Sequence, residues 1–155
     1  MAKISAATFL ATGFGVGRFP KAPGTAGSLL GLVLWWPVMG LGWPGYSLLL
    51  VVALGVGVVA SGRAAIELGL TDPPMVVWDE VVGMGVALLA VPHGLLVVLA
   101  AFGLFRLFDI TKPYPIKRLE RLPGGYGIML DDVLAGVYAN VCLQGVLWIL
   151  SGAPH

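Results

Sequence analysis

The stretch "GGYGIMLDDVLAGVYANVCLQGVLWIL", Gly124 to Leu150, joins two adjacent carboxylates to a long apolar run. No Asp, Glu, Lys or Arg follows Asp132, and a membrane-crossing helix needs about 20 apolar residues. The run from Val133 to Leu150 therefore predicts one such helix. Asp131 and Asp132 stand at its edge, where paired carboxylates are costly unless positive charge holds them.

Composition places the whole chain in the membrane class. Its 155 residues are 58% hydrophobic and 11% charged, whereas an average soluble domain is about 25% charged. This length favours a single domain, residues 1–155. A formal net charge of +1 gives no reason to expect a nucleic acid partner. Cys142 is the only cysteine, which excludes a disulfide within the chain.

Charge-free segments predict where the chain crosses the membrane. The segment from Ala22 to Gly62 lacks charges and is long enough for two passes. It breaks at "GWPG", Gly42 to Gly45, a turn pattern with an interfacial tryptophan. We therefore expect helices over Ser28–Leu41 and Tyr46 to about Arg63. With Val133–Leu150, these give three spanning helices.

A further charge-free segment, Val81 to Phe105, fits either one span or a hairpin of two helices. It contains "VPHG", Val91 to Gly94, which breaks helices. A single span would divide the Lys and Arg residues between the two membrane faces, whereas a hairpin gathers all nine on one face. We expect the hairpin, with arms Asp79–Val91 and Gly94 to about Ile110. The predicted fold is an all-α integral membrane bundle, with three spanning helices and a helical hairpin that enters from the cytoplasmic side.

The polar stretch "GFGVGRFPKAPGTAGS", Gly13 to Ser28, is a candidate phosphate loop. Free N–H groups at a helix start bind anions, and glycines let the backbone approach closely. Hydroxyl groups and two basic side chains add donors and charge. The alternative is a flexible loop that ends in an N-cap at Thr25 or Ser28. The phosphate-binding candidates are Arg18, Lys21, Gly24, Thr25, Gly27 and Ser28.

Five carboxylates lie at predicted helix ends, in three separate stretches of the chain. Each alone suits the dipole of its helix. Because the topology brings all five to one membrane face, we expect them to converge on a hard divalent cation. Oxygen-only ligation favours Mg²⁺ over Zn²⁺, since no cysteine or histidine belongs to the group. The candidate ligands are Asp79, Glu80, Asp109, Asp131 and Asp132.

The stretch "FRLFDITKPYPIKR" adds Arg106 and Lys112 as further phosphate-binding candidates. Arg106 can instead pair with Asp109 three residues on, and Lys112 can extend along the membrane surface. Basic residues beside a Mg²⁺ site indicate phosphate chemistry, by attack of metal-activated water or through a covalent aspartyl-phosphate. A divalent-cation or ion-coupled transporter is the alternative, but its acids would lie nearer mid-span. The catalytic candidates are Asp79, Glu80, Asp131 and Asp132.

Four motifs occur in order between about Gly13 and Asn140: "GFGVGRFPKAPGTAGS", "DPPMVVWDEVVG", "FRLFDITKPYPI" and "GGYGIMLDDVLAG". Together they make the chain resemble phosphatidylglycerophosphatase A, a family of small bacterial inner-membrane enzymes. The resemblance implies Mg²⁺-dependent hydrolysis of phosphatidylglycerophosphate to phosphatidylglycerol and phosphate, on the cytoplasmic face of a multi-pass protein. It leaves the oligomeric state open.

Overall fold

The computed structural model describes residues 4–152, and this part of the chain contains helices and no strand. The predicted all-α class is therefore confirmed. The elements in chain order are α1 (Ala6–Ala11), the 3₁₀ helix η1 (Val16–Arg18), α2 (Pro23–Trp35), the 3₁₀ helix η2 (Trp36–Leu41), α3 (Gly42–Leu68), α4 (Trp78–Ala87), α5 (Leu95–Thr111), α6 (Ile116–Leu119) and α7 (Gly125–Leu150).

Two segments of the described chain are long and apolar enough to cross a membrane. One is Pro23–Leu68, which runs through α2, η2 and α3 and contains an 18-residue window with a mean hydropathy of 2.1, and the other is α7, which contains such a window with 1.8. The predicted third span is not confirmed. With 13 residues, α2 rises only about 20 Å, less than the roughly 30 Å of bilayer hydrocarbon.

The first and the last predicted helices both begin earlier in the structure than the sequence predicted. The first predicted helix, Ser28–Leu41, begins earlier, at Pro23, and ends as an α-helix at Trp35. The last one begins at Gly125 rather than near Val133. Its first turn contains glycines. They are needed because α7 starts against α3, where a Cβ on Gly125 would lie 1.9 Å from the carbonyl oxygen of Val58.

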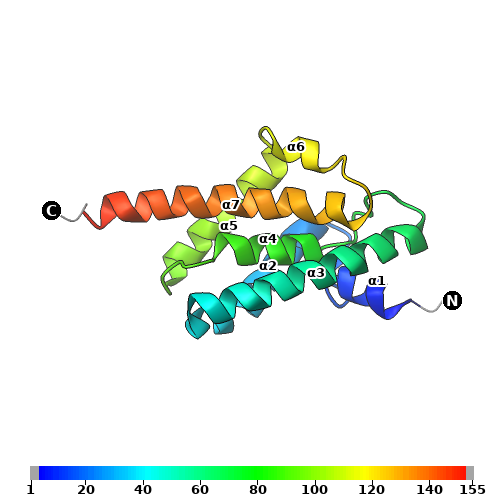
Figure 1. Cartoon of the computed structure of the whole chain (residues 1–155), viewed down its shortest axis with the longest axis horizontal. Coiled ribbons are helices and arrows are strands. Elements are labelled where there is room, and N and C mark those ends of the chain that lie inside the picture. Colours follow the sequence, from blue (N-terminus) through cyan, green and yellow to red (C-terminus); the bar gives the residue numbers. More distant parts are fainter. Residues whose placement is uncertain (1–3, 153–155) are drawn as a thin grey trace.

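The predicted hairpin region is divided into two helices, α4 and α5, joined by a turn at residues 88–94. The helix break expected at Val91–Gly94 is thereby confirmed. This turn, the link between α2 and α3, and the end of α7 all lie at one end of the molecule (Figure 1). The start of α1 and the loop between α3 and α4 lie at the other end. The orientation of this bundle in a membrane stays a prediction.

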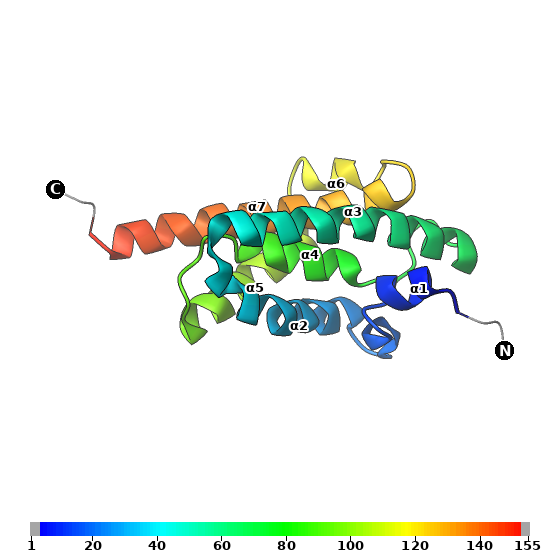
Figure 2. The same ribbon diagram turned by 60° about the horizontal axis from the view of Figure 1, so that its bottom comes forward.

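The short helix α4 forms the centre of the bundle. It packs against α2, α3, α5 and α7, and in Figure 2 it runs between α2 on one side and α3 and α7 on the other. Every residue from Val81 to Leu88 is buried. A Cβ on Gly136 of α7 would lie 2.3 Å from the carbonyl oxygen of Gly83 in α4. Small residues at this crossing therefore let the two helices approach closely, as in membrane helix pairs.

Side-chain donors from neighbouring helices bind the backbone of α4 and its ends. Asn140 of α7 donates from Nδ2 to the carbonyl oxygens of Ala87 and Leu89, at 3.0 and 2.8 Å. The last carbonyl groups of a helix have no partner within it, so Asn140 satisfies acceptors at the end of α4; the carbonyl oxygen of Leu89 also accepts from Nε2 of Gln144, at 3.3 Å. Asn140 therefore holds the end of α4 against α7.

Large apolar side chains remain exposed along α3 and α7. Val51 is 66% exposed on α3, and Ile149 is 70% exposed on α7. Exposing an apolar surface of this extent to water is unfavourable, whereas contact with lipid hydrocarbon removes that cost. The outer faces of α3 and α7 are therefore suited to a bilayer.

Candidate functional site

A group of three carboxylates forms where α4 crosses α7. Asp79 and Glu80 lie in the first turn of α4, and Asp132 lies in α7. One oxygen of each carboxylate lies within 4.8 Å of one oxygen of each of the other two. The close approach at Gly83 and Gly136, one turn further along each helix, brings these side chains together.

Buried carboxylate oxygens in this region have no hydrogen-bond partner among the described residues. They are Asp79 Oδ1, Glu80 Oε2, Asp131 Oδ1 and Asp132 Oδ2. Buried polar atoms are normally paired, because an unpaired one costs free energy. A hard divalent cation satisfies several oxygens of this kind at once. The oxygen-only donor set therefore fits Mg²⁺.

Asp131 and Asp132 are adjacent in sequence but have different partners. Lys112 donates from Nζ to Oδ2 of Asp131 at 2.9 Å, and it also pairs with Glu120. Burial alone would lower the pKa of Lys112, but the hydrogen bonds to Glu120 and Asp131 outweigh it and raise that pKa. Asp131 thus has a cation beside it already, and it stands outside the group of three. The sequence did not single out Glu120, because no regular spacing links it to Lys112 across Pro113.

Arg106 and Asp109 form the ion pair expected from their spacing on α5. Asp109 also stands outside the group of three. Arg106 lies near the start of α2, where a Cβ on Gly24 would be 3.1 Å from its Nη1. The guanidinium group therefore lies between the predicted phosphate loop and the acidic residues.

The glycines of α2 face the carboxylate of Glu80. A Cβ on Gly24 would lie 2.5 Å from Glu80 Oε1, and one on Gly27 would lie 3.3 Å from Glu80 Oε2. The structure thus brings together two stretches that the sequence predicted separately, the phosphate loop and the acidic group. A side chain at either glycine would occupy the space beside Glu80.

The other phosphate-binding candidates are placed differently. Ser28 is buried, and its Oγ donates to the carbonyl oxygen of Gly24 within α2, at 2.8 Å. Thr25 lies inside the first turn, and Ala22, in a left-handed conformation with φ 51°, occupies the cap position. The N-cap interpretation of Thr25 and Ser28 is therefore wrong.

Arg18 and Lys21 are exposed and take part in none of the ion pairs of the described chain. Their phosphate-binding roles stay predictions.

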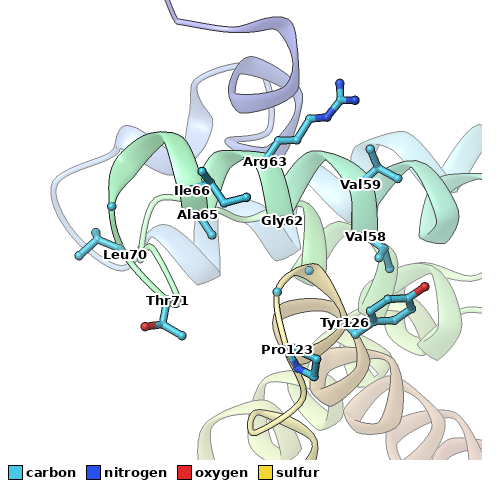
Figure 3. Close-up of a pocket in the computed structure, with 13 residues that line it drawn as sticks. Val58, Val59, Gly62, Arg63, Ala65, Ile66, Leu70, Thr71, Pro123 and Tyr126 are labelled. Carbon is cyan, nitrogen blue, oxygen red and sulfur yellow. The ribbon is translucent and has the colours of Figure 1, made fainter.

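One cavity lies apart from the carboxylates. It has a volume of about 640 Å³ and lies between the C-terminal half of α3 and the start of α7 (Figure 3). Arg63 is its only charged lining residue, and no member of the acidic group reaches it. The chemistry indicated by the carboxylates therefore does not belong to this cavity.

Comparison with known proteins assigns the family. The family model described as phosphatidylglycerophosphatase A matches residues 9–147. The chain belongs to this family. The resemblance seen in the four motifs is confirmed, and with it the prediction of an enzyme. The transporter alternative is not supported.

Three curated relatives cover most of the chain. Phosphatidylglycerophosphatase A of Escherichia coli is 39% identical over 143 residues, which cover 91% of this chain and 81% of the relative. The protein of the same name in Haemophilus influenzae is 41% identical over 147 residues, covering 91% and 89%. A protein of Bacteroides thetaiotaomicron, provisionally named a phosphatidylinositol-3-phosphatase, is 41% identical over 150 residues, covering 91% and 93%. No solved structure matches the chain.

Proposed function

We propose that the protein is a Mg²⁺-dependent lipid phosphatase that converts phosphatidylglycerophosphate to phosphatidylglycerol and phosphate. Membership of the phosphatidylglycerophosphatase A family supports the reaction. One structural observation supports the site: the group of three contains buried carboxylate oxygens without partners, and its member Glu80 lies beside Gly24 and Gly27 at the start of α2. Anion-binding backbone and cation-binding oxygens are the two components that a phosphate ester bound with Mg²⁺ requires.

Asp79, Glu80 and Asp132 would hold the metal, with Asp109 and Asp131 as further candidate ligands. When bound, Mg²⁺ neutralises phosphoryl oxygens and increases the acidity of water. Its all-oxygen preference matches these side chains, and the three oxygens within 4.8 Å of one another provide a compact ligand set.

The start of α2 and the neighbouring basic side chains would hold the phosphate. The N–H groups of Gly24 and Thr25 lie in the first turn of α2, where a helix offers them no acceptor. Arg106 lies beside Gly24, and Lys112 lies beside Asp131. Such donors balance the charge of a phosphate monoester and fix its orientation.

In the proposed reaction a water oxygen forms a bond to phosphorus as the ester oxygen departs in line. A carboxylate of the acidic group accepts one proton of the water, and this proton is then passed to the departing glycerol oxygen. The acyl chains stay in the bilayer beside the apolar outer faces of α3 and α7. We place the reaction at the cytoplasmic face of the bacterial inner membrane, because the basic residues gather at that predicted face.

Phosphate release from purified protein tests the proposal. We expect turnover of phosphatidylglycerophosphate with Mg²⁺, none with a chelator, and a loss of at least a hundredfold in Asp132→Asn. Asp72→Asn, an exposed acid outside the group, is the matched control. Metal-independent turnover, or a fully active Asp132→Asn variant, would contradict the metal site.

Two further measurements separate the remaining alternatives. Phosphatidylinositol 3-phosphate, chosen for the relative named after that activity, should be hydrolysed more slowly than phosphatidylglycerophosphate. Acid quenching during turnover of a substrate labelled in its phosphomonoester should leave no label on the protein. Label retained on an aspartate would replace direct water attack by a covalent route.

A further inference from the structure

Two open cavities lie next to each other along α3. The first, of about 320 Å³, lies between α2 and α3, and the second, of about 450 Å³, lies between α1 and α3. Both are lined by Leu10 and Val56, so they adjoin, and we treat them together as one groove. Along α3 the groove extends from Leu49 to Arg63, about 21 Å at the rise of an α-helix. We call it the α3 groove.

The body of the α3 groove is apolar. Its inner wall includes Trp78 and Val81 of α4, and its outer walls carry Leu, Val and Ala side chains. The indole N–H groups of Trp35 and Trp78 already donate to carbonyl oxygens of Val81 and Ala53, at 2.8 and 3.1 Å. This part of the groove therefore offers no free polar group to a ligand, and it suits a hydrocarbon chain.

One end of the α3 groove carries a single cation. Arg63 lines this end and forms no ion pair with any described residue. In Figure 3 its side chain points away from Pro123 and Tyr126. Glu67, one turn further along α3, forms no ion pair with Arg63 and accepts hydrogen bonds from Ser5 and Thr8 instead. The guanidinium donors of Arg63 are thus available to an anion.

We propose that the α3 groove binds one anionic phospholipid of the bilayer, with an acyl chain along α3 and the headgroup phosphate at Arg63. The groove, about 21 Å long, is long enough for an acyl chain, since one leaflet provides about 15 Å of hydrocarbon, half of the roughly 30 Å core. The charge also fits, since arginine binds phosphate through several donors at once. This site is separate from the carboxylates, because Glu80 faces the glycines of α2 and Arg106 rather than α3.

Fluorescence quenching by brominated lipids tests this site directly. Trp36, Trp43 and Trp148 are replaced by phenylalanine, so that Trp35 and Trp78 in the groove remain as reporters. The full chain is reconstituted, with a chelator present, in vesicles of phosphatidylcholine that contain increasing amounts of a lipid with brominated acyl chains. That lipid is phosphatidylglycerol in one series and phosphatidylcholine in the other. Because the chelator removes divalent metal, the result does not depend on the proposed phosphatase reaction.

We expect half-maximal quenching at about a fivefold lower fraction of brominated phosphatidylglycerol than of brominated phosphatidylcholine, the effect of one basic residue near the surface. Arg63→Gln should abolish this preference, and Lys117→Gln, an exposed base outside the groove, should keep it. Val56→Phe, at a position 45% exposed and shared by both cavities, should weaken quenching by both lipids. Equal quenching in the parent protein, or a preference that survives in Arg63→Gln, would overturn the proposal.

Discussion

A Cβ atom on Gly24 would lie 2.5 Å from Oε1 of Glu80, so a side chain in the first turn of α2 would displace the carboxylate of Glu80 in the first turn of α4. The start of α2 was expected to approach a phosphate, and it also borders the acidic group. One glycine thus serves two requirements, the space beside Glu80 and the accessibility of the helix N-terminus.

Gly24→Ala should reduce turnover on the order of 10²-fold, because the added methyl group displaces Glu80 and a shift of about 1 Å at a reacting site has an effect of this size. Steady-state phosphate release checks it. Gly103→Ala is the matched control, since a Cβ there meets no atom within 4 Å and alanine favours a helix. If both alanine variants have the turnover of the parent protein, the space beside Glu80 is not needed for the reaction.

Mg²⁺ should raise the melting temperature of the parent protein, because a ligand of the native state stabilises it by mass action. At a Mg²⁺ concentration one hundred times its dissociation constant, the free energy of unfolding rises by about 2.7 kcal/mol. Asp79→Asn and Asp132→Asn should lose this shift, and Asp72→Asn should keep it. Thermal melts with Mg²⁺ and with a chelator measure the shift. An undiminished shift in Asp132→Asn would remove that residue from the ligand set.

Lys112→Met should destabilise the fold, because it leaves the carboxylate of Asp131 buried without its cation. The loss of one partner of a fully buried pair costs about 3–5 kcal/mol. We expect a smaller loss of stability here, since the Lys112 side chain is 26% exposed. The double variant with Asp131→Asn should recover part of the loss. Denaturant unfolding measures both, with Lys117→Met as the control. Strictly additive effects would show that the two side chains are not coupled.

Cysteines at Thr71 and Lys117 should both be labelled from the cytoplasmic side, and a cysteine at His93 from the opposite side. All three residues are exposed in the structure. They lie in the α3–α4 loop, in α6 and in the turn between α4 and α5. A membrane-impermeant thiol reagent on intact and opened cells measures this, in a Cys142→Ala background that removes the only native thiol. Labelling of Thr71 and Lys117 from opposite sides would exclude the hairpin topology.

The sequence by itself determined the helical class, the helix break near Pro92 and the family. These depend on local signals: apolar runs, a proline–glycine turn and four motifs with their own spacing. The same signals misplaced the start of α7, because Gly125 and Gly127 suit a loop when tertiary contacts are ignored. In the fold, the absence of a side chain at Gly125 is what lets α7 begin against α3.

Only the tertiary structure decided which neighbours each acidic residue has. Successive side chains on an α-helix point about 100° apart, so Asp131 and Asp132 face different neighbours. Asp131 meets Lys112 at the end of α5, and Asp132 meets Asp79 and Glu80 of α4. The neighbour on each side depends on which helices cross and where, and glycine contacts such as Gly83 against Gly136 fix that crossing. No pattern within a single segment contains this information, because the contacting residues are far apart in the chain.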